Sequence, residues 1–301
     1  MSLSIGTNDS AMRASQAASI AARGMEASME RLSTGKRINS ASDDAAGVAI
    51  SSRLSAEIRG TNQSVRNALD AQALLDTAEG SHKEIENVLQ RMREIAVQSA
   101  NDTNNTQDRL NLQTEMNSMI KEIDRIAHAT TWAGQNLLDG DANGDPDTNA
   151  AFSFQVGSAT GTQNQISVNI GSTTAESLGL THTDGNSLAI VIADATATAN
   201  GRTATEHVTG NAATTAAGNA MVTIGVIDAA IEEVNTQRST LGATANRLNH
   251  TVNNLTNISA NLSSAQGRIQ DADFAIETTN LAKNQILQQA STAMLAQANA
   301  S

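Results

Sequence analysis

A long heptad repeat near the C-terminal end constrains this chain more than any other feature. Between Ile224 and Leu262, apolar residues recur at alternating steps of three and four, and only Arg238 and Ser259 interrupt them. The repeat is typical of a helix that packs lengthwise on other helices. At 1.5 Å per residue it would run roughly 55–60 Å, longer than an ordinary globular domain accommodates. Such a seam needs a partner of similar length.

Two upstream stretches can cover the seam. Residues 54–96 have the same repeat, with a phase slip around Gln72 that predicts local overwinding. Residues 112–126 form a shorter version. Because both stretches lie far upstream, we predict a mainly α fold. It is an elongated antiparallel bundle, or coiled coil, of long helices from both chain ends.

Helix boundaries are marked by residues that cap helices. Gly35 fits the end of a first helix over residues 8–33. The Ser-Asp-Asp run at 42–44 offers oxygens and negative charge for the start of a long helix that ends near Gln98. Thr106 is expected to cap the next helix, and the short linker before it predicts an antiparallel helical hairpin.

The helices at the two chain ends are weaker. The stripe over residues 8–33 is mostly alanine, and the last helix, which begins near Phe274, is rich in Gln and Ala. Helices of this kind bury little area alone and are marginal in isolation. We predict that the two helices pair, and that residues 1–32 become ordered only when a partner arrives.

The middle of the chain has a different pattern. Apolar and polar residues alternate in two runs that predict a β-hairpin over about 151–171. Residues 132–140 are expected to form a loop. Residues 193–220 are rich in Ala, Thr, Asn and Gly without a period, which predicts a surface insert.

Composition excludes several classes of protein. Aromatic residues make up 1% of the chain, fewer than a compact globular core normally uses. The net charge of −12 argues against nucleic acid or an anionic membrane as a partner. There is no cysteine and no apolar run of membrane-spanning length. Residues 1–19 lack the apolar core of a secretory signal peptide, so we expect export by another route.

Motifs for catalysis or metal binding are not found. The five histidines are scattered, and His82 falls on the helical seam, where a packed histidine is the simplest interpretation. Residues 139–144 match the first half of a calcium loop, but its twelfth position is Ala150 instead of Glu, which favours a solvated turn. We predict no cofactor, no metal and no enzyme activity.

Three long motifs resemble those of bacterial flagellins. Residues 33–47 (Ser-Thr-Gly-Lys-Arg-Ile-Asn-Ser-Ala-Ser-Asp-Asp-Ala-Ala-Gly) resemble the connector of that family. Residues 90–101 (Gln-Arg-Met-Arg-Glu-Ile-Ala-Val-Gln-Ser-Ala-Asn) resemble its rod-domain signature. Residues 268–274 (Arg-Ile-Gln-Asp-Ala-Asp-Phe) and 284–290 (Asn-Gln-Ile-Leu-Gln-Gln-Ala) are similar to its C-terminal signature.

The resemblance implies a structural subunit that polymerises into the extracellular helical filament of the bacterial flagellum. The partners it implies are other copies of the chain, the flagellar export apparatus, an export chaperone and the filament cap. It implies three parts: an inner-tube domain of terminal helices (1–42 and 264–301), a helical rod domain (43–180 and 218–263), and a short variable surface insert (181–217). The family usually continues for roughly three more helical turns with apolar residues, so we expect either a less completely closed inner tube or a sequence that is truncated at its C-terminus.

Two groups of residues are candidate packing surfaces. The inner-tube group is Met25, Leu32, Phe274, Leu281, Leu287 and Leu295. The rod group, interpreted as exposed positions beside the seam, is Gln90, Arg91, Ile95, Gln98 and Glu115. Arg91, Ile95 and Glu115 match positions that, in flagellins of enteric bacteria, contact a toll-like innate-immune receptor of animal hosts. Subunit packing is our preferred role for this group, and receptor binding is conditional on an animal host.

Two alternative functions share the predicted architecture. A hook–filament junction protein would have the same paired chain ends. A secreted helical ligand or adhesin would also be helical, but it would stay monomeric.

Overall fold

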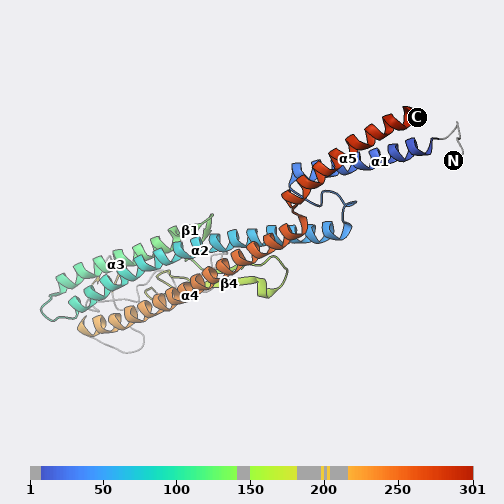
Figure 1. Cartoon of the computed structure of the whole chain (residues 1–301). Helices are drawn as coiled ribbons and strands as arrows, with labels where there is room; N and C mark the ends of the chain where they lie inside the picture. The colour runs from blue at the N-terminus through green and yellow to red at the C-terminus, as the bar shows by residue number, and fades with distance from the viewer. Residues whose placement is uncertain (1–7, 141–149, 182–197, 200–201, 204–215, 301) are drawn as a thin grey trace. The chain divides into compact units, whose positions relative to one another are not determined.

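The computed structural model describes residues 8–140, 150–181, 198–199, 202–203 and 216–300. Within these ranges the fold is mainly α, and long helices come from both ends of the chain, as the sequence predicts (Figure 1). The α-helices are α1 (Asp9–Thr34), α2 (Ala45–Ser99), α3 (Thr106–Ala129), α4 (Ala216–Gln270) and α5 (Phe274–Ala300). Contacts divide the chain into a terminal unit, Met1–Asn62 with Thr256–Ser301, and a central unit, Gln63–Leu255.

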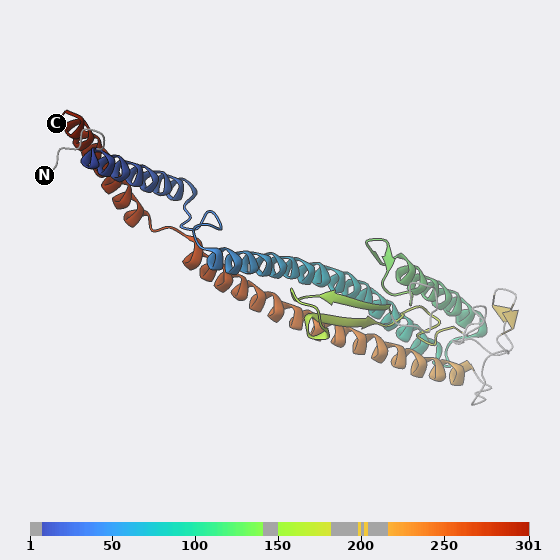
Figure 2. The same ribbon diagram turned by 90° about the vertical axis from the view of Figure 1, so that its right-hand side faces the viewer.

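The core of the central unit lies where α2, α3 and α4 meet. In this unit α2 and α4 lie side by side, and α3 lies along α2 (Figure 1 and Figure 2). His82 contacts Gln237, whereas Arg93, later in α2, contacts Asp228, earlier in α4. The two helices are therefore antiparallel, as predicted. The largest fully buried side chains of α2 are Leu75, Ile85, Leu89, Met92 and Ile95.

The seam of α2 is continuous, so the phase slip predicted around Gln72 is wrong. Ser64 and Ala71 are buried, whereas their more apolar or larger neighbours Val65 and Gln72 are only half-buried. With Ser64 and Ala71 in the seam, steps of three and four alternate without a break from Thr61 to Ser99, and the two consecutive steps of three lie upstream, at Ile58, Thr61 and Ser64. No overwinding is expected around Gln72.

The predicted seam of α4 is confirmed, although the helix begins earlier than its first large apolar residue. It begins at Ala216, upstream of Ile224, because Ala220 and Thr223 extend the buried stripe with small side chains. Each large aliphatic side chain buried in the seam contributes about 1.5–3 kcal/mol. The seam residues spaced by seven and at most 2% exposed are Ile227, Val234, Leu241 and Leu248.

The N-terminus of α3 is capped by Asn105, one residue before the predicted cap Thr106. The Asn105 side-chain oxygen accepts a hydrogen bond from the Asp108 amide at 2.9 Å, and the Asp108 carboxylate accepts one from the Asn105 amide at 3.2 Å. This reciprocal capping box satisfies two amides that the helix itself leaves free. The helix then packs on α2 as the second arm of the predicted hairpin.

The predicted β-hairpin is present in the central unit. Its strands are β3 (Ala150–Gln155) and β4 (Gln165–Ile170), which pair antiparallel with Phe152 opposite Val168 and Phe154 opposite Ile166. The alternation is amphipathic as expected, since Ile166, Val168 and Ile170 are buried while the β4 residues between them are exposed.

The segment predicted as a loop over residues 132–140 contains a second, minimal hairpin. Strands β1 (Thr131–Trp132) and β2 (Gln135–Asn136) are joined by Ala133 and Gly134, with φ of 50° and 85°. Two consecutive residues with positive φ match the tight turns that join antiparallel strands. Within the predicted insert, β5 (Thr198–Ala199) pairs with β6 (Arg202–Thr203).

In the terminal unit, α1 and α5 lie side by side, so the predicted pairing of the two chain ends is confirmed (Figure 1 and Figure 2). α1 ends at Gly35, with φ of 69°, as predicted. The segments that connect the helices also pair: the Arg37 amide donates to the Gln270 carbonyl at 2.7 Å, and the Ala272 amide donates to the Gly35 carbonyl at 2.9 Å. These two bonds hold the connectors together as a short antiparallel bridge.

The Asp-Asp pair before α2 has two separate tasks. The Asp44 carboxylate accepts a hydrogen bond from the Gly47 amide at 2.9 Å, which is how an N-cap residue acts. The Asp43 carboxylate instead accepts hydrogen bonds from the Asn39 and Ser40 amides of the connector. Both hydrogen bonds lower the pKa of the Asp43 carboxyl below its ordinary value, and the bond from the Ser40 amide has the larger effect, followed by that from the Asn39 amide.

Candidate subunit-packing surfaces

The contact between α1 and α5 is made of small and polar side chains. Ala14, Ala21 and Ser28 of α1 are buried at intervals of seven residues. On α5, Glu277 and Ser291 are buried with a spacing of fourteen. The alanine and serine side chains let the two helix backbones approach closely.

A glycine and an ion pair complete this contact. A Cβ atom at Gly24 would lie 2.7 Å from the side-chain amide nitrogen of Asn284, so the two helices touch closely there. The Glu277 carboxylate is 3.8 Å from the Arg31 guanidinium. In the contact between α1 and α5, polar groups therefore meet at one end and small residues pack along the length.

The inner-tube residues named from the sequence fall into two groups. Met25 and Leu32 of α1 and Leu281 and Leu295 of α5 are half-buried. Phe274 is 64% exposed and Leu287 is 45% exposed. The apolar residues of α5 therefore do not share one face toward α1.

Large apolar side chains of both terminal helices remain exposed in the single chain. These residues do not take part in the buried contact between α1 and α5. In the described part of the terminal helices they are Met12, Ile20, Met29, Phe274, Ile276, Ile286, Leu287 and Met294. Exposed apolar groups of this number on one helical pair mark a surface that another molecule covers.

The rod group of candidate residues is charged and mostly exposed. Arg91 of α2 forms ion pairs with Glu94 at 2.9 Å and with Glu115 of α3 at 3.1 Å. Its hydrogen bonds to Glu94 and then Glu115 raise the pKa of the Arg91 guanidinium. Gln90 and Gln98 are also exposed. The group is a solvated surface that crosses from α2 to α3.

Ile95 does not belong to that surface. Its side chain is fully buried in the core of the central unit, so its interpretation as an exposed position is wrong. The reason is the helical period: Ile95 lies three residues after Met92 and faces inward with it. Any effect of Ile95 on a partner would act through the fold.

A polar layer interrupts the apolar seam of the central unit. His82, interpreted from the sequence as a packed histidine, is fully buried, and its ring nitrogens lie 2.7 Å from the Ala78 carbonyl and 2.9 Å from the Gln237 amide oxygen. Next to it, Arg238 donates a hydrogen bond to the Glu86 carboxylate. The charge of Arg238 inside the seam is thus paired across the helices.

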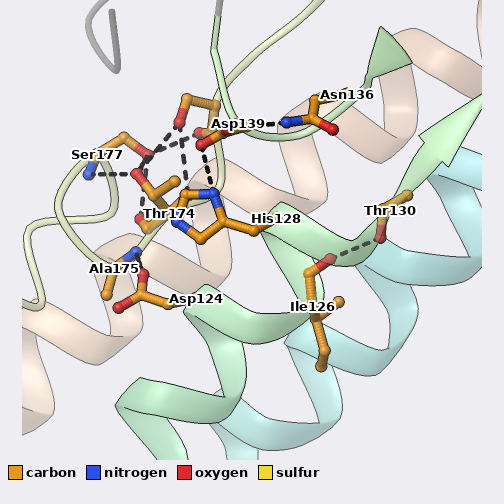
Figure 3. Close-up of polar contacts among 10 residues, drawn as sticks. Asp124, Ile126, His128, Thr130, Asn136, Asp139, Thr174, Ala175 and Ser177 are labelled. Atoms are coloured by element: carbon orange, nitrogen blue, oxygen red, sulfur yellow. Dashed lines mark hydrogen bonds and ion pairs between the residues drawn. The ribbon is translucent and has the colours of Figure 1, made fainter. Parts of the chain in front are cut away.

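A second polar cluster ties the segment after β4 to the C-terminal end of α3 (Figure 3). The Asp124 carboxylate accepts a hydrogen bond from the Ala175 amide at 2.7 Å, and His128 lies 2.8 Å from Asp139. The Ser177 hydroxyl donates to the Ser172 carbonyl at 2.8 Å, so it is a structural donor. Although Ser, His and Asp are close here, their contacts are those of a folded loop.

Two features are absent from the described residues. No group of three His, Cys, Asp or Glu side chains there could hold a metal ion. Among the same residues, no helix is both long and apolar enough to cross a membrane. The half calcium loop lies mostly outside the described residues.

The arrangement of helices and exposed faces defines a class of protein: a helical structural subunit whose paired chain ends present an uncovered apolar surface. Comparison with known proteins gives the family. The profile for the bacterial flagellin N-terminal helical region matches residues 5–143, and that for the bacterial flagellin C-terminal helical region matches residues 224–301. The chain belongs to the bacterial flagellin family.

Individual relatives agree. The chain is 41% identical over 278 residues to flagellin of Bacillus subtilis, which covers 90% of this chain and 88% of the relative. It is 34% identical over 375 residues to polar flagellin A of Vibrio parahaemolyticus, which covers 100% and 98%. Among solved structures, a provisionally named flagellar hook-associated protein of Vibrio parahaemolyticus has a TM-score of 0.57 at 18% identity, over 76% of this chain and 100% of that one, which is a likeness of fold.

The family is one of structural proteins, and its members form the extracellular flagellar filament. The sequence-based identification of the family and of the filament role is therefore confirmed.

Proposed function

We propose that this chain polymerises through the exposed apolar faces of α1 and α5, which become buried against the same helices of neighbouring copies. The observation that carries the proposal is the outward direction of Phe274, Ile276 and Ile286, with exposed fractions of 61–66%. Covering such side chains contributes about 25 cal/mol for each Å² of apolar surface removed from water. We further propose that residues 1–32 are ordered only in the polymer, and that 1–42 with 264–301 form the inner tube.

Deletion of residues 1–32 tests this proposal. We expect a soluble protein in which α2, α3 and α4 remain folded but which sediments only as a monomer. A sharper variant replaces Ile286 and Met294 by serine, with leucine at both positions as the matched control. The serine variant should fail to form filaments under negative-stain microscopy, whereas the leucine variant should form them. Filaments from the deletion or from the serine variant would contradict the proposal.

Membership of the flagellin family supports a further proposal about assembly and export. We propose that the chain leaves the cell through the flagellar export apparatus with an export chaperone, without a cleaved secretory signal peptide, and is added under a filament cap. The role is structural, without enzyme activity or cofactor. A hook–filament junction role is the alternative, because a hook-associated protein shares the fold. Extended self-assembly of the purified protein would favour the filament role, and assembly arrested at short oligomers would favour the junction.

For the surface around Arg91 we propose subunit packing, supported by its exposed ion pairs with Glu94 and Glu115. Gln90 and Gln98 extend this surface. If the bacterium lives with an animal host, the same surface would face a toll-like receptor in the monomer. Arg91→Ala tests this in a receptor-activation assay, with Arg125→Ala on α3 as the matched control. No loss of activation by Arg91→Ala would remove the receptor proposal and leave the packing proposal intact.

A further inference from the structure

The few aromatic residues of this chain gather at one place in the central unit. The sequence contains one Trp, three Phe and no Tyr. Three of these four rings, Trp132, Phe152 and Phe154, belong to the hairpins β1–β2 and β3–β4. All three are only half-buried, and the Phe rings stack with their centroids 6.4 Å apart. The fully buried core of the central unit is therefore aliphatic, and three of the four aromatic side chains lie at its surface.

Two of these rings line a groove between α2 and β3. The groove has a volume of about 280 Å³. Its lining includes Ala71 and Leu74 of α2, which are 1% and 4% exposed, together with Trp132 and Phe154. The Asn67 side chain donates a hydrogen bond to the Gln155 carbonyl at 3.0 Å and so fixes the strand to the helix. The groove is built from elements that hold each other in place.

A carboxylate without a cation lies in the lining of the groove. Asp70 is exposed, and no Lys or Arg of the described residues lies within ion-pair distance of it. The indole N–H of Trp132 likewise has no hydrogen-bond partner among the described residues. A carboxylate that lacks an ion-pair partner and lies beside two aromatic rings fits a long cationic side chain. The stem of such a side chain can lie on the rings while its charged end reaches the carboxylate.

The chain itself supplies such groups. Lys83, Lys121 and Arg247 are exposed, and none of them has an ion-pair partner among the described residues. Because aromatic rings and arginines are enriched where proteins meet, a copy of the same chain satisfies both the groove and the cation. We propose that this groove binds a lysine or arginine side chain of a second copy of the chain in the filament. This inference rests on the proposed polymerisation.

Charge reversal in the groove tests the proposal. Asp70→Lys is compared with Asp76→Lys, which makes the same change at another exposed position of α2, outside the groove lining. We expect Asp70→Lys to raise the critical concentration for polymerisation about tenfold or more, since the introduced ammonium group would face the like-charged Lys or Arg of the second copy. Asp76→Lys should change it less than about twofold. Circular dichroism of the monomers checks that both variants are folded.

A second measurement identifies the occupant. Because the chain has no cysteine, Ser153→Cys in the groove lining accepts a single photo-crosslinking maleimide. Irradiated filaments should give a crosslinked dimer whose adduct maps next to a Lys or Arg of the other copy. An adduct found only within the same chain would overturn the groove proposal. So would Asp70→Lys filaments that form at the wild-type critical concentration. Both outcomes leave the filament role standing. A wild-type protein that does not polymerise would overturn both.

Discussion

Arg238 of α4 donates a hydrogen bond to the Glu86 carboxylate of α2, inside a seam that is otherwise apolar. The two side chains are 27% and 17% exposed, and Glu79 lies 3.8 Å from the same guanidinium. The Nε atom of Arg238 is buried without a hydrogen-bond partner. The arginine thus occupies the seam at some cost, and its carboxylate partners offset that cost.

Removal of only one member of this pair is expected to destabilise the central unit. Arg238→Leu leaves the Glu86 charge in the seam without its closest partner, which should lower the free energy of unfolding by about 2–3 kcal/mol. The double variant Arg238→Leu with Glu86→Leu should recover most of that loss, because two apolar residues fit a heptad seam. Urea unfolding of the wild type, the single variants Arg238→Leu and Glu86→Leu, and the double variant measures the coupling between the two sites. Equal losses from the single and double variants would contradict this account.

The capping box of α3 gives a prediction with a control one residue away. Asn105→Ala should lower the free energy of unfolding by about 1 kcal/mol, because the Asp108 amide loses its acceptor. Thr106→Ala should be nearly neutral, as Thr106 lies inside the helix and does not cap it. Thermal unfolding followed at 222 nm compares the two variants. A larger loss of stability from Thr106→Ala than from Asn105→Ala would instead identify Thr106 as the cap, as the sequence predicts.

The seam between α1 and α5 should tolerate only small residues. Ala21 is 4% exposed, so Ala21→Leu would force the helix backbones apart, whereas Ala21→Ser keeps a small side chain. We expect the leucine variant to sediment as monomer under conditions in which the serine variant and the wild type form polymer. The melting of the central unit should be unchanged in both. Normal polymer from Ala21→Leu would show that α1 and α5 are not held in this close contact.

The connector before α2 should respond to acid through Asp43. Its pKa is lowered in the folded protein, so its stabilising effect is present above the ordinary Asp pKa near 3.8 and is lost as the pH falls through the lower folded value. Protection of the Asn39 and Ser40 amides from hydrogen exchange should therefore decrease below about pH 4. Asp43→Ala should lack this protection at every pH. Protection that is insensitive to both the pH and the substitution would rule out the carboxylate as the acceptor.

The sequence predicts the long elements of this fold well because their signals repeat many times. Each seam contains several apolar residues at heptad spacing, so single exceptions such as Arg238 do not obscure the helix. The β-hairpin is predicted for the same reason, since apolar and polar residues alternate over 152–156 and over 165–170. Single-residue decisions are less secure: strict alternation from Leu54 selects Val65, but Ser64 is the buried residue, so the predicted phase slip around Gln72 is wrong.

The candidate surfaces are harder to predict, because exposure depends on what a neighbouring element requires. Apolar residues of α5, Phe274 among them, were named from the sequence as inner-tube packing positions. In the structure Glu277 and Ser291 are the buried residues of α5, whereas Phe274 is 64% exposed. The groove beside Trp132 had a signal that was not used: aromatic residues that are rare throughout the chain lie close together in the sequence.

The bridge between the two connectors has a mechanical consequence. The Arg37 amide bonds to the Gln270 carbonyl and the Ala272 amide to the Gly35 carbonyl, so the segment that follows α1 and the one that precedes α5 are fastened to each other. Each hydrogen bond joins one connector to the other, so a change in the path of one connector requires breaking bonds to the other. The path of the chain that leaves α1 is therefore coupled to the path of the chain that enters α5.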